Sequence, residues 1–278
     1  YIASVIAAMI IGWETSGASR EIYTVLPVLI ASAGIFASVL GTVFVRISEK
    51  GNPGGALNRG TFSTCFIFAI FTFLLTYYVG LERQQALGVF FATSAGLVAG
   101  VVIGVTTDYF TSIDRPPVLK TAEVSKTGAA INILTGFSYG IMSIVPPLLG
   151  ICSATLASWY LASAYGVHPV YGIAVAAVGM LSIVGMIISA DAYGPIADNA
   201  KGIAEQAGLG KDVIEISDRL DAAGNTSKAI TKGFAIGAAA LTVLALFAAY
   251  AEIVKIQTID ITKPEVISGV FIGGMMPP

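Results

Sequence analysis

The sequence predicts an all-α, polytopic transmembrane helix bundle, and three observations lead to that fold class. Of the 278 residues, 55% are hydrophobic and only 12% are charged, whereas soluble domains carry about 25% charged residues. The mean hydropathy is +0.82. The apolar residues also occur in long runs, and a helix needs about 20 of them to cross a bilayer. The sequence therefore predicts a single transmembrane domain, residues 1–278, that is surrounded by lipid.

Eight apolar segments are predicted to be membrane spans. The first and last are short and lie at the two ends of the chain, so we expect an internal fragment of a longer protein. The fifth contains Pro146 and Pro147, which predict a kinked long helix or two shorter helices. The segments are 1–13, 23–45, 61–79, 86–110, 129–164, 170–198, 230–253 and 266–278.

The positions of Lys and Arg predict how the bundle is oriented. Cytoplasmic loops carry an excess of these residues, and most of the 15 in this chain follow the second, fourth or sixth predicted span. That side is therefore predicted to be cytoplasmic. It includes residues 201–223, which we expect to form a charged, water-facing linker with a short amphipathic helix. The opposite side holds Arg20, Arg83, Lys255 and Lys263.

Composition and motifs exclude several classes of function. The net charge of −2 gives no sign of a nucleic-acid partner. The two cysteines, Cys65 and Cys152, lie far apart in apolar runs and are expected to be structural. The chain contains no P-loop and no HExxH zinc motif. A nucleotide-driven pump with its own P-loop is therefore not supported.

Two carboxylates end the sixth predicted span. Asp191 and Asp198 are seven residues apart, which places them on one face of a helix. Ionisable groups at membrane depth are costly and usually face a polar interior, and neighbouring carboxylates repel unless a cation lies between them. Mg²⁺ is commonly held by one or two carboxylates together with substrate phosphates. Solvated helix-end residues are the equally weighted alternative.

Small polar residues open the seventh predicted span. Asn225 or Thr226 is expected to cap that helix, or the positive helix end could approach an anion. Lys228, Thr231 and Lys232 follow within two turns. Lysines are unfavourable near a helix N-terminus, and a nearby anion or carboxylate cluster would resolve that conflict.

These stretches resemble the membrane-bound, ion-translocating pyrophosphatases. Residues 191–199 read DAYGPIADN and are followed by GIAE at 202–205, which is similar to one motif of that family. Residues 224–237, GNTSKAITKGFAIG, are similar to a second. Residues 125–130 and 144–147 also resemble this family, and the similarity covers essentially the whole chain.

The resemblance implies a fold of two concentric helix rings and a homodimer in the lipid bilayer. Inner-ring helices near 170–200 and 224–253 would carry the site. Asp191, Asp198 and Asn225 would bind pyrophosphate as its magnesium complex, with Asn199 and Lys232 as possible accessory residues. The other acidic sets of the family, including those that hold the nucleophilic water, are absent from this chain, so it is expected to be inactive alone.

Lys228 is the position that distinguishes two branches of this family. The potassium-dependent branch has Ala at the matching position, whereas the potassium-independent branch has Lys, and Thr231 fits the latter. A tethered ammonium can supply the charge of a bound K⁺. Three departures are Lys201, where Gly is usual, Gln206, where Met is common, and Ser227 in place of Thr.

The implied function is pyrophosphate hydrolysis coupled to H⁺ transport out of the cytoplasm. Na⁺ transport by the same kind of enzyme is the first alternative. A secondary solute transporter without hydrolase activity and a non-catalytic membrane subunit are the others. A bacterial plasma membrane is the expected location, with an acidic organelle membrane as the alternative.

Overall fold

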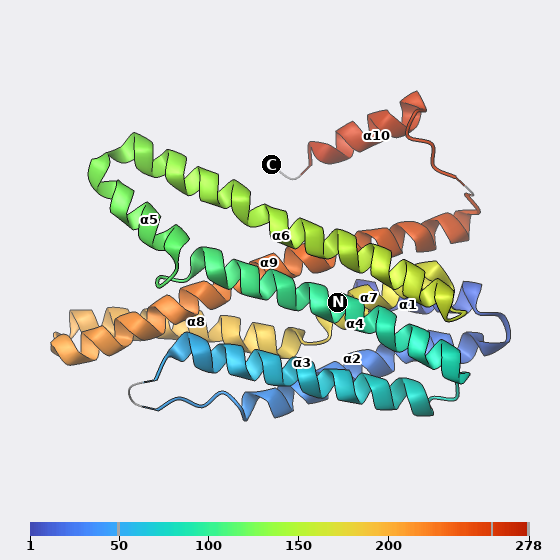
Figure 1. Cartoon of the computed structure of the whole chain (residues 1–278), viewed down its shortest axis with the longest axis horizontal. Coiled ribbons are helices and arrows are strands. Elements are labelled where there is room, and N and C mark those ends of the chain that lie inside the picture. Colours follow the sequence, from blue (N-terminus) through green and yellow to red (C-terminus); the bar gives the residue numbers. More distant parts are fainter. Residues whose placement is uncertain (49–50, 257, 277–278) are drawn as a thin grey trace.

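The computed structural model describes residues 1–48, 51–256 and 258–276, and this part of the chain contains no strand. The predicted all-α class is confirmed (Figure 1). The α-helices are α1 (Ile2–Thr15), α2 (Arg20–Thr42), α3 (Pro53–Tyr78), α4 (Arg83–Thr111), α5 (Pro116–Val124), α6 (Ala129–Ala164), α7 (Pro169–Leu181), α8 (Val184–Gln206), α9 (Lys211–Val254) and α10 (Pro264–Gly274). Two short 3₁₀ turns, η1 (Gly17–Ser19) and η2 (Ser125–Thr127), complete the described elements.

Six helical segments among the described residues are long and apolar enough to cross a membrane. They correspond to the second through seventh predicted spans. The first and eighth correspond to α1 and α10, which are only 14 and 11 residues long. A polytopic helical bundle is therefore supported, although eight spans are not confirmed. Figure 1 shows the segments that follow α2, α4 and α8 at the same end of the bundle.

The structure decides two local predictions. Pro146 and Pro147 lie inside α6, one helix of 36 residues, so the segment is one long helix and the alternative of two shorter helices is wrong. The interruption lies instead in the predicted span 170–198, where Ser182 and Ile183 separate α7 from α8. The Ser182 hydroxyl donates to the carbonyl of Val178 at 2.7 Å, so its side chain competes with the helical backbone pattern.

Helix α7 forms the centre of the bundle. It contacts α1, α2, α4, α6 and α9, and nine of its 13 residues are buried. The Tyr171 side chain is fully buried, and its hydroxyl donates to the Tyr23 carbonyl at 2.9 Å, which meets the requirement that a buried polar group be paired. This apolar centre supports α8, which continues the same path toward the charged end of the molecule.

Glycines permit the close approach of α4 to α7. A Cβ atom at Gly96 would lie 1.8 Å from the Ala176 carbonyl oxygen, and one at Gly179 would lie 2.3 Å from the Thr93 oxygen. Neither neighbour is a flexible side chain, so a larger residue must separate the two backbones. Small residues that allow such contacts are characteristic of helix packing in membranes.

Replacing Gly96 with Ala is expected to lower the thermal unfolding midpoint of the purified full-length protein. The added methyl group meets backbone on α7, and overpacking of this kind costs about 1–3 kcal/mol. Gly104→Ala on the same helix is the matched control, because its Cβ would lie 3.8 Å from the nearest atom, in Ile230. Equal midpoints for the two variants in a detergent melting experiment would contradict the packing argument.

Candidate functional site: a charged helical hairpin

A helical hairpin made by α8 and α9 holds the candidate site. Helix α8 ends in a Schellman-type turn, in which Gly208 has a φ of 63° and the Leu209 amide donates to the Ala204 carbonyl at 3.2 Å. Gly210, with a φ of 94°, precedes α9. Left-handed backbone of this kind favours glycine. The two helices then run side by side, as Figure 1 shows.

This hairpin corrects the predicted linker. Residues 201–223 were expected to be a connector with a short helix, but the described turn covers only 207–210 and the remainder belongs to α8 and α9. Helix α9 is 44 residues long. The predicted cap is also wrong, because Asn225 and Thr226 lie about four turns inside α9 rather than at its start. The expected conflict between Lys228 and a helix N-terminus therefore disappears.

The two helices approach each other closely at a pair of glycines. A Cβ atom at Gly224 would lie 2.7 Å from the Cα of Gly194. Beside this contact, the Tyr193 hydroxyl donates to the Leu220 carbonyl at 3.1 Å. These contacts hold the facing backbones together, so polar side chains on either side of the pair can reach across from one helix to the other.

A row of polar side chains follows this seam. Lys201 of α8 pairs with Asp218 at 2.8 Å and with Asp221 at 3.4 Å. The Asn225 amide nitrogen donates to Asp221 at 3.0 Å. The Lys228 ammonium donates to the Asn225 amide oxygen at 3.3 Å. The row therefore passes from one lysine to the other through a carboxylate and an amide.

Lys228 connects this row to Asp198. Its nitrogen lies 4.0 Å from the Asp198 Oδ2 atom, and its side chain is 28% exposed, whereas that of Asp198 is 62% exposed. Charges at this separation and exposure attract weakly. The carboxylate thus retains exposed oxygen atoms that could contact a ligand, with the Lys228 ammonium beside them.

The remaining predicted residues take different positions. Asp191 lies half-buried on α8, and Lys232 is exposed on α9. The Asn199 amide donates to the carbonyl of Pro195 within its own helix at 2.8 Å, away from the row described above. The Thr231 hydroxyl donates to the Ser227 carbonyl at 3.0 Å. The structure therefore brings together Asp198, Asn225 and Lys228.

The described residues contain no group of three or more Asp, Glu, His or Cys side chains arranged to hold a metal ion. The predicted ligands that lie on the hairpin are the carboxylates of Asp191 and Asp198 and the amide oxygen of Asn225. Hard divalent cations accept these oxygen donors but need further ligands from phosphate, water or protein. The donor set therefore fits part of a magnesium–phosphate site.

Sequence reasoning missed Lys201, Asp218 and Asp221 as partners of the site. Lys201 was noted only as a departure from the family, and the two aspartates were assigned to the water-facing linker. A usable signal was present, because Asp218, Asp221, Asn225 and Lys228 follow the three- and four-residue steps of one helix face. It was missed because α9 was expected to begin near residue 224.

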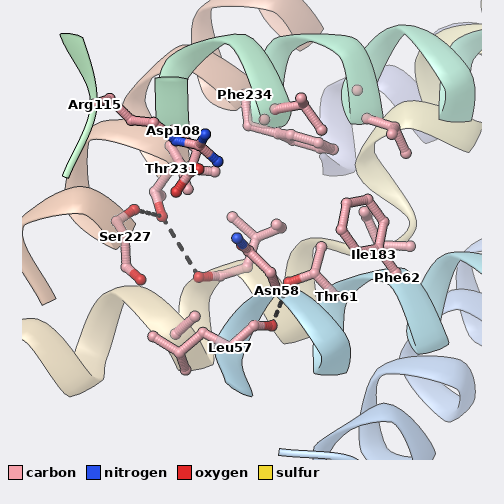
Figure 2. A pocket seen from close by; sticks show the side chains of 17 residues that line it. Leu57, Asn58, Thr61, Phe62, Asp108, Arg115, Ile183, Ser227, Thr231 and Phe234 are labelled. Carbon is pink, nitrogen blue, oxygen red and sulfur yellow. Dashed lines mark hydrogen bonds between the residues drawn. The ribbon is translucent and has the colours of Figure 1, made fainter. Parts of the chain in front are cut away.

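A separate cavity of about 210 Å³ lies between α3, α4, α8 and α9. Figure 2 shows the Thr231 and Ser227 side chains at this cavity, with Asn58, Asp108 and Arg115 also labelled around it. Thr231 is the one member of the predicted site that contributes to its lining. The cavity is thus adjacent to the charged row without containing Asp198, Asn225 or Lys228.

The fold and this hairpin define a polytopic helical membrane protein in which the helix pair α8–α9 carries charged, oxygen-rich side chains. The model of the inorganic H⁺ pyrophosphatase family matches residues 1–278. The chain belongs to this family, so the family resemblance of the two hairpin motifs is confirmed.

Several curated relatives cover the chain at similar identity. A putative K⁺-stimulated pyrophosphate-energized sodium pump of Clostridium tetani is 41% identical over an alignment of 279 positions, which covers 100% of this chain and 41% of the relative. A K⁺-insensitive pyrophosphate-energized proton pump of Methanosarcina mazei is 40% identical over an alignment of 282 positions, which again covers 100% of this chain and 41% of the relative.

A third relative is K⁺-insensitive pyrophosphate-energized proton pump 2 of Moorella thermoacetica, which is 42% identical over an alignment of 263 positions that covers 91% of this chain and 38% of the relative. The chain thus spans about two fifths of the length of these relatives. Their names include both ions and both responses to K⁺, so overall identity does not separate the branches.

Proposed function

We propose that the protein containing this chain hydrolyses pyrophosphate as its magnesium complex and couples hydrolysis to H⁺ transport out of the cytoplasm, independently of K⁺. The observation that carries the proposal is the position of the Lys228 ammonium, 3.3 Å from the Asn225 oxygen and 4.0 Å from Asp198. In this position a fixed positive charge stands beside a ligand-binding carboxylate, as a bound K⁺ would.

The chemistry of the substrate fits these residues. Pyrophosphate is a polyanion, and its hydrolysis depends on charge neutralisation and on an oriented water. Bound Mg²⁺ would supply that neutralisation, and the oxygen atoms of Asp198, Asn225 and Asp191 are the donors that this chain would offer. Lys228 holds a proton at its ammonium and adds positive charge beside Asp198. Asn199 and Lys232 remain possible accessory contacts.

The remaining parts of the site and the assembly are proposed for the whole protein. Other carboxylates must orient the attacking water, since this hairpin supplies only one side of a phosphate site. We expect a homodimer of two-ring subunits in a bacterial plasma membrane, with an acidic organelle membrane as the alternative. The charged end of α8 and α9 would face the cytoplasm.

Na⁺ is the alternative transported ion, and the Clostridium tetani relative, named as a sodium pump, favours it. A secondary transporter is less well supported. Such proteins bind solutes at helix breaks near mid-membrane, but Asp198 lies 15 residues beyond Ile183, about 22 Å along a helix. The exposed carboxylate is thus remote from the interruption between α7 and α8.

The proposal is tested with the full-length protein in sealed vesicles. Magnesium pyrophosphate should release phosphate and acidify the vesicle interior, and a protonophore should abolish the acidification while leaving hydrolysis intact. Phosphate release no greater than that of heat-inactivated vesicles would refute the proposed hydrolase. Uptake of ²²Na⁺ that resists the protonophore, without primary acidification, would instead assign Na⁺.

A further inference from the structure

Lys201 is the only cation in the described part of the chain that pairs with carboxylates of α9 from another helix. Its nitrogen lies 2.8 Å from the Asp218 Oδ1 atom and 3.4 Å from the Asp221 Oδ2 atom. The Asp221 side chain is only 14% exposed. A carboxylate with so little exposure needs a partner for its charge, and Lys201 provides one from α8.

The two oxygen atoms of Asp221 have different partners. Oδ2 faces Lys201, whereas Oδ1 accepts the hydrogen bond from the Asn225 amide nitrogen at 3.0 Å. Contacts on both oxygens restrict rotation of the carboxylate about its Cβ–Cγ bond. Lys201 therefore keeps Oδ1 directed at Asn225.

Asn225 transmits this orientation to Lys228. Because its NH₂ group donates to Asp221, its carbonyl oxygen is directed the other way, and that oxygen accepts from the Lys228 ammonium at 3.3 Å. The polarity is consistent along the row, since each nitrogen donates and each oxygen accepts. If Asp221 were released, the Asn225 amide could turn over and present NH₂ to Lys228, which would repel the ammonium.

We propose that Lys201 is a positioning residue that fixes the Lys228 ammonium through Asp221 and Asn225. The inference rests on the proposed function only where it concerns K⁺. By pairing with Asp221 at one end of the row, Lys201 keeps the Lys228 ammonium, at the other end, in its place beside Asp198. Residue 201 thus strengthens potassium independence without touching Lys228 itself.

The test uses the full-length protein with Lys201→Gln, which removes the charge and keeps a polar side chain. The rate at which acetic anhydride modifies Lys228 is measured by mass spectrometry. We expect it to rise about two- to tenfold, the factor that corresponds to the net contribution of one hydrogen bond. The Lys201→Arg variant, which keeps the positive charge, should be labelled at Lys228 at the parent rate. Asp221→Asn, which lacks the charged link, should raise the rate as Lys201→Gln does.

Lys211→Gln is the matched control. Lys211 is an exposed lysine of the same hairpin, and among the described residues it has no ion pair. Its replacement should leave labelling of Lys228 unchanged. If the Lys201→Gln and Asp221→Asn variants, shown to be folded by their melting curves, label Lys228 at the parent rate, the proposal is overturned.

Activity gives a second readout. Lys201→Gln should become stimulated by K⁺, about two- to tenfold, whereas a hairpin that is merely loosened should lose turnover equally with and without K⁺. That uniform loss, with unchanged labelling, would overturn the proposal. If the parent protein released no phosphate, the proposed function would fail, but the labelling rates would still decide whether Lys201 positions Lys228.

Discussion

Replacing Lys228 with Ala is expected to make pyrophosphate hydrolysis by the full-length protein dependent on K⁺. Without the ammonium, Asp198 and the Asn225 oxygen lose the positive charge that lies 4.0 Å and 3.3 Å from them. Hydrolysis in K⁺-free medium should fall about tenfold or more, because hydrogen bonds to charged groups contribute about 1.5–3 kcal/mol. Added K⁺ should restore most of the loss by occupying the vacated position.

The measurement is phosphate release at fixed magnesium pyrophosphate while K⁺ replaces a large organic cation at constant ionic strength. The parent protein should show no response, and Lys211→Ala should behave like the parent because it lies far along the hairpin from Lys228. Strong stimulation of the parent by K⁺ would show that Lys228 does not replace that ion. A variant that is inactive at every K⁺ concentration would also contradict substitution by a bound cation.

Replacing Asp198 with Asn is expected to reduce hydrolysis about 100-fold, the loss typical when one electrostatic partner of a reacting group is removed. The substitution preserves size and one carbonyl oxygen while removing the charge that attracts a divalent cation. Asp198 is 62% exposed, so the folded state should tolerate the change. The loss should be accompanied by a higher Mg²⁺ requirement.

Phosphate release measured over a range of Mg²⁺ concentrations separates these effects. Asp212→Asn is the control, since Asp212 is an exposed carboxylate in the first turn of α9. It should retain parent activity at all Mg²⁺ concentrations. If Asp198→Asn kept parent activity and parent Mg²⁺ dependence, Asp198 would be a solvated residue and the site would have to be placed elsewhere.

The local geometry of the hairpin shows where prediction from sequence failed. The sequence predicts that Asn225 or Thr226 caps a helix start, because small polar residues before an apolar run are typical caps. In the structure Gly224 serves a different purpose, since its missing side chain lets α9 approach Gly194. The real turn, at Gly208 and Gly210, was hidden within a charged stretch that resembled a solvated connector.

The interruption between α7 and α8 was decided in a similar way. Helix α6 continues through its two prolines, as the long-helix prediction required, whereas α7 ends at Leu181 without a proline or a glycine at the break. Gly34 of α2 packs directly on the Ser182 carbonyl, and the Tyr1 hydroxyl lies 3.1 Å from the Ser182 hydroxyl. Neighbours from distant parts of the chain surround this position, so tertiary contacts rather than local propensity place the break here.

The sequence by itself determined the helical membrane fold, the family and the two motifs that contain Asp198, Asn225 and Lys228. It could do so because hydrophobic runs and motif spacing are properties of neighbouring residues. Only the tertiary structure decided which side chains meet across the hairpin, including Lys201 with Asp221 and Lys228 with Asp198. These contacts require atoms of both helices to lie close together and aligned, and that condition depends on how two helices pack.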